Sequence, residues 1–568
     1  MFAPYGSSPA WAAGTLLIVA IFLLFKMFSL NYYAGDEHIY IYQGGLVAKG
    51  LVPYADFSEA HPPLQLLLVA VLFKLFGYHF LLARLLPVGW TLAGGLVLAF
   101  GVRRELGTVA SLAATALYLL AYDVLRASSH FTGVEMTVAF LLAMFFSHRR
   151  GWTRACAIFG VLAVLTRLYA LPCVFFTLGY AMLTDRRRGL RILAWTLGLG
   201  LAGAAAVAIW AGPGNLVREI IRFHALKMPM SPRSLASTRT LVLAHNMPLA
   251  LLFTLSVSLL AWRLRGIGAS RRKRDRSPWL NRIHLAIQES RTELVLQAAG
   301  VALAYFVILA LMTRIWIYYY VLAFPFAAVA SGWLVAEWLR LARAAARSQG
   351  RPAGIAWNRT AALSALSLLA LFLVGSSLRP LLVADLEEQG EDKGGPAPER
   401  TLSYTWRPGR LPAGLNNLVR SLFWSDSRIV GKAYPDWTYL LWHESLTLET
   451  ADEVVRSIVA RVSPEGAIFG DASTVPLFAL LSHRRIAANE IDTNLQRYRS
   501  GFTDPAALIR KIDLPTTEMI ITWDGHGVGT LPELKRLLEA KYTQVGAPRD
   551  PRGVWRLFLR RPELDGAP

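Results

Sequence analysis

Long apolar blocks run through the first two thirds of the chain and constrain its fold more than any other feature. An α-helix needs roughly 17 to 25 mostly apolar residues to cross a bilayer. We interpret about eleven blocks as such spans, of which 133–147, 155–168 and 169–184 are short. The blocks are 11–30, 80–101, 107–122, 133–147, 155–168, 169–184, 191–211, 247–262, 294–312, 316–338 and 360–379. With 54% hydrophobic and 17% charged residues, the chain is predicted to be a polytopic α-helical membrane protein.

The first block follows no positively charged segment and has no small-residue cleavage site. We therefore expect an uncleaved span rather than a signal peptide.

Basic residues concentrate in alternate loops between the blocks. The clusters are Arg103 and Arg104; Arg149, Arg150 and Arg154; Arg186 to Arg188; Arg271, Arg272, Lys273, Arg274 and Arg276; and Arg340, Arg343 and Arg347. Such alternation is the positive-inside signature, so these loops and the N-terminus are predicted to be cytoplasmic. The net charge of +21 is thus interpreted as a topology signal and not as nucleic-acid binding.

The remaining loops then face outward, to the periplasmic side of a bacterial inner membrane. They are 31–79, 123–132, 212–246 and 313–316, together with the tail after residue 380. Residues 62–79 are apolar but begin with Pro-Pro and carry Lys74. A full span there would break the charge alternation, so we expect an interfacial helix.

The composition changes after the last block, and three regions are predicted. They are a transmembrane catalytic module over 1–384, a linker over 385–400 and a soluble α/β domain over 401–568. The last region alternates helical patterns with short apolar runs. The expected helices are 451–462, 505–512 and 531–541, and the expected strands are 466–470, 518–523 and 554–559.

Two acidic residues follow predicted strands of this domain, Asp471 and Asp524. This geometry can bind a ligand, but an Asp at the end of a strand most often caps the next helix, which is our interpretation. The only cysteines, Cys156 and Cys173, lie inside apolar blocks, so the domain must be held together by its core.

The first outward loop carries an acidic pair, Asp36 and Glu37, directly after the first span. A charge beside the bilayer is costly unless it faces water or a partner, which makes this pair a candidate functional site. The loop continues through a turn at 50–54 to His61 and two prolines. Its other acids, Asp56 and Glu59, are expected to be solvated.

The other outward ionisable groups recur at the ends of spans. They are His130, Thr132 and Glu135; Arg167 and Tyr169; Arg218, Arg222, His224, Lys227 and Arg233; and Arg314 with Tyr318, Tyr319 and Tyr320. A carboxylate can deprotonate an acceptor hydroxyl, and Arg, Lys and Tyr side chains can stabilise charge developing on a phosphate. The pattern therefore indicates transfer from an anionic lipid leaving group.

The first loop resembles that of the GT-C superfamily of polyprenyl-phosphate-sugar-dependent glycosyltransferases, in particular protein O-mannosyltransferases and lipid A aminoarabinose transferases. The matching elements are Asp36-Glu37, Tyr40, Gly50-Leu51-Val52-Pro53-Tyr54, His61-Pro62-Pro63-Leu64, Leu75-Phe76-Gly77 and an Arg-Leu-Leu-Pro at Arg84. The resemblance covers roughly residues 10–340.

The resemblance implies that Asp36 is the catalytic base of an inverting transfer, with Glu37 as its neighbour. The position before Pro-Pro, a Lys near the donor phosphate in these families, is His61 here, and His is mostly neutral at pH 7. The family's fourth-span acid corresponds to Glu135. Its outward-loop cation corresponds to Arg222 or Lys227, and its hydroxyl before the tenth span to Tyr318 or Tyr319. Arg167 and Arg314 complete the expected phosphate-binding set.

We therefore expect a glycosyltransferase that moves a sugar from a polyprenyl-phosphate donor to an acceptor glycan, lipid or protein. The donor, the acceptor and membrane lipids are its expected partners. No nucleotide-phosphate loop is found and no cofactor is assigned; a requirement for a divalent cation stays open. A transporter or flippase of lipid-linked sugars is the main alternative. A transporter is expected to have ionisable groups near the middle of the bilayer and broken helices in paired halves. The ionisable groups of this chain lie instead at the ends of the predicted spans. A third possible function is that of a non-catalytic scaffold whose outward domain is the binding module.

Overall fold

The computed structural model describes residues 9–29, 35–272, 292–347, 448–525, 527–550 and 553–562. They belong to two compact units, Met1–Lys26 with Gln43–Leu371, and Met27–Tyr42 with Phe372–Pro568. The boundary between the units falls within helix α2 (Gly35–Ala48). The predicted linker 385–400 and the predicted span 360–379 lie outside the described residues.

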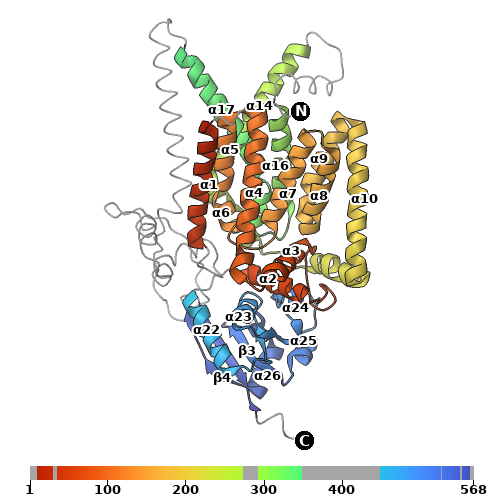
Figure 1. The fold of residues 1–568 in the computed structure, drawn as a ribbon, viewed down its shortest axis with the longest axis vertical. Helices are drawn as coiled ribbons and strands as arrows, with labels where there is room; N and C mark the ends of the chain where they lie inside the picture. Colours follow the sequence, from red (N-terminus) through yellow and green to blue (C-terminus); the bar gives the residue numbers. More distant parts are fainter. Residues whose placement is uncertain are drawn as a thin grey trace, which may run out of the picture. The chain divides into compact units, whose positions relative to one another are not determined.

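The first unit is a bundle of helices that lie side by side (Figure 1). Its long helices are α1 (Pro9–Ser29), α4 (Phe80–Leu106), α5 (Thr108–Leu119), α7 (Val134–Arg149), α8 (Thr153–Thr166), α9 (Leu171–Thr184), α10 (Arg186–Ala211), α14 (Met247–Arg272), α16 (Glu293–Leu311) and α17 (Phe324–Arg347). Small residues let them approach closely, as expected for helices packed in a membrane. A Cβ added at Gly332 of α17 would lie 2.5 Å from the backbone oxygen of Ala110 in α5.

Helix α10 indicates that this bundle lies in an apolar environment such as lipid. Its 26 residues are long and apolar enough to cross a membrane, yet only 6% of its most apolar stretch is buried. Ile209 is 85% exposed. Soluble monomers rarely expose a large contiguous apolar surface. Among the residues described, α4 and α16 also have the length and hydropathy of a membrane span.

The predicted apolar blocks coincide with helices in most places, with two differences. The block 316–338 is wrong over its first third, because Ile317–Leu322 form a 3-10 turn (η3) and α17 begins only at Phe324. The predicted loop 212–246 is largely helical. It contains α11 (Pro213–Leu216), a π-helical turn η2 (Val217–Arg222), α12 (Phe223–Leu226) and α13 (Pro232–His245).

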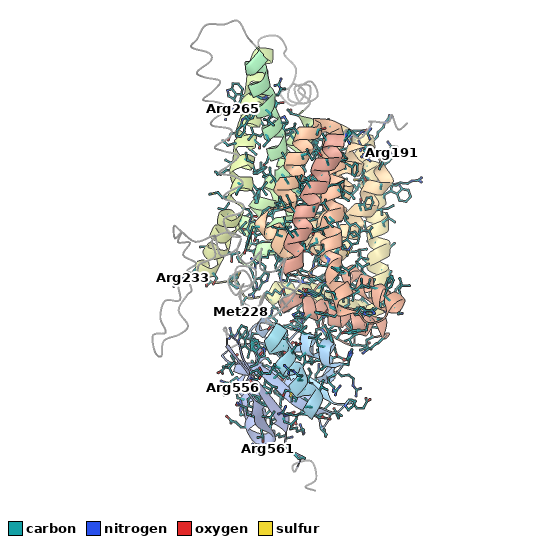
Figure 2. The ribbon with its side chains drawn as sticks, turned by 60° about the vertical axis from the view of Figure 1, so that its left-hand side comes forward. Arg191, Met228, Arg233, Arg265, Arg556 and Arg561 are labelled. Atoms are coloured by element: carbon teal, nitrogen blue, oxygen red, sulfur yellow. The ribbon has the colours of Figure 1, made fainter. Side chains whose placement is uncertain are left out.

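The basic loops and the helical segment 213–245 lie at opposite ends of the bundle. Arg191 and Arg265 lie at one end, and Met228 and Arg233 lie at the other (Figure 2). At the basic end, Arg149 ties three helix ends together. Its guanidinium is 2.7 Å from the carboxylate of Glu105 and 2.8 Å from that of Glu293. Such charge-assisted contacts fix helix ends to each other.

Residues 62–79 contain the predicted helix as α3 (Leu64–Phe76); its interfacial position stays a prediction. The helix starts directly after Pro62-Pro63, where missing N–H groups cost nothing.

The second unit contains a mixed sheet with the strand order β2-β1-β3-β6-β4, with β5 paired to β6. Its strands are β1 (Ala467–Gly470), β2 (Arg485–Ile486), β3 (Thr517–Trp523), β4 (Tyr542–Gly546), β5 (Arg549–Asp550) and β6 (Gly553–Arg560). Strands β2, β1 and β3 are parallel, and β6 runs antiparallel to β3 and β4. The helices are α22 (Leu448–Arg461), α23 (Val475–Ser482), α24 (Leu495–Arg499), α25 (Pro505–Ile512) and α26 (Pro532–Lys541).

The core of this unit is formed by apolar faces of β1, β3, α25 and α26, with Phe469, Ile520 and Leu534 fully buried. The predicted strands and helices of the domain are each within three residues of those observed. Asp471, at the end of β1, is buried and accepts hydrogen bonds from the backbone N–H groups of Trp523 (2.9 Å) and Val528 (2.7 Å). Asp471 therefore ties β1 to the end of β3 and to the segment after it. The prediction that it caps the next helix is wrong, because α23 has Thr474 at its N-cap.

Candidate active site

The first-loop motif folds into a turn that fixes the position of His61. Tyr54 adopts a left-handed backbone conformation, with φ 69°, and its N–H donates to the backbone oxygen of Phe57. Its hydroxyl donates to the backbone oxygen of His61 at 2.5 Å. The Pro-Tyr turn and the His-Pro-Pro element thus form one structural unit.

Two histidines meet at this turn. The rings of His61 and His224 lie 5.6 Å apart, and Nε2 of His224 is 2.8 Å from the backbone oxygen of Ala60. Burial, and then the charges of Arg167, His224 and Lys227, hold the pKa of His61 well below its usual range. His61 is therefore neutral at pH 7, as the sequence predicted, and the cation that the resemblance places here is missing at this position.

Glu59 corrects one expectation about the loop acids. It is buried, not solvated, and its carboxylate accepts the backbone N–H of His61 at 2.7 Å. Asp56 is exposed as expected, and it accepts the backbone N–H of Val52. The two acids differ because Glu59 points toward the turn that Tyr54 closes, whereas Asp56 caps that turn from outside.

Arg167 lies between α8 and the 3-10 turn η1 (Leu168–Ala170), and it is buried. Its guanidinium donates to the backbone oxygen of Thr132 and, at 3.3 Å, to the side-chain oxygen of Gln65 in α3. Gly133 makes this approach possible. It has φ 79°, and a Cβ there would lie 2.1 Å from the Gln65 side-chain oxygen. Three segments distant in sequence thus hold one cation.

Glu135 is buried in the first turn of α7 and interacts electrostatically with Arg167 and Lys26. Its Oε1 has no hydrogen-bond partner among the described residues. A buried carboxylate with an oxygen left for a ligand is a candidate functional group, because burying it without a partner is costly.

Lys26 is a candidate site residue that sequence reasoning missed. It lies in α1, is buried, and donates to the hydroxyl of Ser129 at 2.8 Å and to the backbone oxygen of Leu125. A Lys inside an apolar block was the signal available. Arg84 and Arg126 are also buried, and all three cations interact electrostatically with His130. Burial and these charges hold the pKa of His130 well below its usual range.

A third group surrounds Tyr319. Its ring lies 4.1 Å from that of Tyr169 and 4.7 Å from that of Tyr318. Arg314 interacts electrostatically with all three tyrosines and donates to the backbone oxygen of Met228 at 2.9 Å. Arg167 also interacts electrostatically with Tyr169, so this aromatic group adjoins the Arg167 group.

The two candidate cations of the segment 212–246 differ in position. Lys227 lies close enough to His61 for its charge to lower the pKa of that histidine. The Lys227 ammonium is 4.5 Å from the ring centre of Phe223. Arg222 is exposed at the end of the π-helical turn. Lys227 is therefore the better candidate of the two for ligand binding.

Asp36 and Glu37 form the first turn of α2, in the part of the chain that belongs to the second unit. Glu37 is buried, and Asp36 is half-buried. Acidic residues in a first helical turn interact favourably with the helix dipole. Their catalytic role stays a prediction. Within the described ranges, no group of three or more His, Cys, Asp or Glu side chains is placed to hold a metal ion.

The comparison with solved structures gives an overall match. ArnT from Cupriavidus metallidurans bound to undecaprenyl phosphate matches with a TM-score of 0.56 at 18% identity, over 97% of this chain and 98% of that chain. The apo state of the same protein matches with a TM-score of 0.54 at 18% identity, over 96% of this chain and 98% of that chain. The chain has the ArnT fold. No protein-family model and no curated protein matches the sequence.

The ArnT fold confirms the fold implied by the first-loop resemblance, because ArnT is a GT-C glycosyltransferase. It also agrees with the apolar helices and the C-terminal mixed sheet described above. Together, the ArnT fold and the lipid-facing character of α10 indicate a multi-pass membrane protein.

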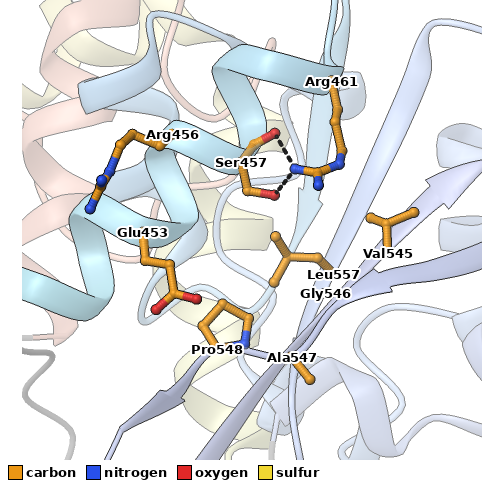
Figure 3. Close-up of a pocket in the computed structure, with 9 residues that line it drawn as sticks. All are labelled: Glu453, Arg456, Ser457, Arg461, Val545, Gly546, Ala547, Pro548 and Leu557. Carbon is orange, nitrogen blue, oxygen red and sulfur yellow. Dashed lines mark hydrogen bonds between the residues drawn. The ribbon is translucent and has the colours of Figure 1, made fainter.

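An open pocket of about 400 Å³ lies in the second unit, between α22 and the segment 545–548 (Figure 3). Arg461 is turned toward Ser457, to which its guanidinium donates at 2.7 Å. Glu453 and Arg456 also line this pocket. None of the predicted site residues does, so it is separate from the candidate active site.

Proposed function

We propose that this protein is a membrane glycosyltransferase that moves a sugar from a polyprenyl-phosphate donor to an acceptor hydroxyl, with inversion at the anomeric carbon. The observation that carries the proposal is the ArnT fold over nearly the whole chain. One of the matching ArnT structures is bound to undecaprenyl phosphate, which supports a lipid-phosphate donor.

The cations around His61 and Tyr319 support the same donor class. Arg167, with Lys227 and Arg314 nearby, offers guanidinium and ammonium groups suited to a phosphate. His61 is neutral, so these cations take the place of the family's lysine in our proposal. Tyr318 and Tyr319 supply hydroxyl groups beside Arg314.

In the proposed reaction Asp36 accepts the proton of the acceptor hydroxyl. The acceptor oxygen bonds to the anomeric carbon while the bond from that carbon to the phosphate oxygen breaks. The polyprenyl phosphate leaves with the electron pair, and the cations stabilise its added charge. A single displacement of this kind inverts the anomeric configuration. Glu37 orients Asp36, and Glu135 is available to bind the donor sugar.

An assay of the purified protein with a panel of polyprenyl-phosphate sugars tests this function. We expect transfer with at least one of them and none with nucleotide sugars alone in lipid-free detergent. Movement of the lipid-linked sugar across proteoliposomes without any transfer product would contradict the proposal and favour a flippase.

The proposed orientation places the end with Arg191 and Arg265 in the cytoplasm and the end with Arg233 outside. Single cysteines introduced at these exposed positions should differ in labelling by a membrane-impermeant reagent. We expect labelling of intact cells at 233 only, and labelling at 191 and 265 only after permeabilisation. The native Cys156 and Cys173 are buried, so their background is small. The reverse pattern would overturn the orientation.

Gln65→Glu tests the hydrogen bond to Arg167. The uncharged oxygen of Gln65 holds the guanidinium without reducing its positive charge, whereas a carboxylate would reduce it. We expect the donor KM to rise about tenfold at pH 7, which corresponds to roughly 1.4 kcal/mol, and to recover at lower pH as the new carboxyl is protonated.

The matched control is Gln297→Glu, at another fully buried glutamine, in α16. It should reduce thermal stability without a pH-dependent donor KM. A similar pH-dependent KM in both variants would show a general effect of a buried carboxylate.

A further inference from the structure

The helix that carries the acidic pair is bonded to the sheet of the second unit. The backbone N–H of Ile486 in β2 donates to the hydroxyl of Tyr42 in α2 at 3.0 Å. Both residues belong to the second unit, and both are buried. Arg485, the other residue of β2, interacts electrostatically with the same hydroxyl. The contact therefore joins residues 444 positions apart in the chain.

Tyr42 provides a hydrogen-bond acceptor for a buried backbone N–H group at the edge of the sheet. In the strand order β2-β1-β3-β6-β4, β2 is an edge strand that pairs only with β1 among the described residues. An edge strand presents backbone N–H groups with no strand partner, and such a group costs free energy when it is buried. Ile486 is 3% exposed, so its N–H cannot rely on bulk water. The tyrosine hydroxyl is its hydrogen-bond partner.

The same contact has a consequence for the acidic pair. Tyr42 lies six residues after Asp36 in one continuous helix, about 9 Å along its axis. A rigid helix transmits the position of one end to the other over this distance. The hydrogen bond at Tyr42 therefore restrains where the first turn of α2, with Asp36 and Glu37, is held relative to β2.

We propose that Tyr42 is a positioning residue, and that the C-terminal α/β region holds the acidic helix α2 in its active position through the edge of its sheet. The inference rests on the proposed role of Asp36. It gives the C-terminal region a part in the reaction without requiring it to bind a substrate.

The test is Tyr42→Phe, which removes the hydroxyl and keeps the ring. Losing one hydrogen bond of this kind typically changes a rate or equilibrium by about two- to tenfold, so we expect kcat to fall by that factor. The donor KM should stay within about twofold, because no donor-binding group has changed. Hydrogen exchange of the full-length protein should accelerate together in peptides covering 35–42 and 485–486.

The matched control is Tyr542→Phe, which also removes a buried hydroxyl bond in the same unit. The Tyr542 hydroxyl donates to the backbone oxygen of Thr517 at 2.9 Å, away from α2. This variant should lose thermal stability but keep exchange at 35–42 and kcat.

Unchanged exchange at 35–42 in Tyr42→Phe would overturn the inference, as would an unchanged kcat in an active enzyme. If the wild-type protein transfers no sugar from any polyprenyl-phosphate donor, the proposed function fails. Exchange then still decides whether Tyr42 couples the helix to the sheet.

Discussion

Replacing Asp36 with Asn is expected to lower the transfer rate by a factor of about 10² to 10⁴, the usual cost of losing a general base. The change keeps the shape of the side chain and removes its ability to accept a proton. Donor binding and folding should survive, because Asp36 is half-buried at the start of α2 and Asn suits the start of a helix as well as Asp does. Single-turnover kinetics with a bound donor measures the effect directly.

Two near-isosteric variants make this result interpretable. Glu37→Gln should cost less than Asp36→Asn if Glu37 only orients its neighbour. Asp56→Asn should be nearly neutral, because Asp56 is exposed and its cap to the N–H of Val52 needs only an oxygen acceptor. An Asp36→Asn protein with wild-type transfer rates would remove Asp36 from the mechanism.

Replacing Arg167 with Gln is expected to reduce kcat/KM for the donor by a factor of about 10² to 10³, the typical loss when one charge-stabilising donor is removed. The guanidinium is buried, where a charge acts more strongly than in water. Gln can still bond to the backbone oxygen of Thr132, so part of the local structure is kept. Steady-state kinetics with a polyprenyl-phosphate sugar checks the loss.

Lys74→Gln is the control for this change. It also removes one positive charge, but from an exposed position near the end of α3. Its kcat/KM should stay within about twofold of the wild type, as for an ordinary surface change. Equal losses in both variants would mean that total charge matters and the position of Arg167 does not. Melting temperatures in detergent separate lost activity from lost folding.

Most of the fold could be predicted because apolar length is a strong signal. The spans and the strands of the C-terminal region follow from runs of apolar residues with a clear period. The start of α17 could not be predicted in this way. Residues 317–322 are as apolar as a span, but they form a 3-10 turn in which the rings of Tyr318 and Tyr319 lie 4.7 Å apart. The helices of 213–245 were missed because they are too short or too polar to give the signal of a span.

The candidate site was predicted only in part, because its geometry depends on segments distant in sequence. The first-loop motif identified His61, and the span ends identified Arg167. No local pattern could show that Gln65 bonds to Arg167 or that Gly133 leaves room for that bond. Glu59 was misjudged because a loop acid is usually solvated, and here the turn closed by Tyr54 buries it.

The order of the strands determines when the C-terminal region can fold during synthesis. Strand β6 is the last strand of the described chain, yet it lies inside the sheet, between β3 and β4. Until the ribosome has released residues 553–560, β3 and β4 have no strand to join them. Strands β2, β1 and β3 can pair with one another before that point, but β4 can join the sheet only after β6. A truncation before residue 553 removes an interior strand, and we expect it to leave the whole α/β region unfolded and open to proteases.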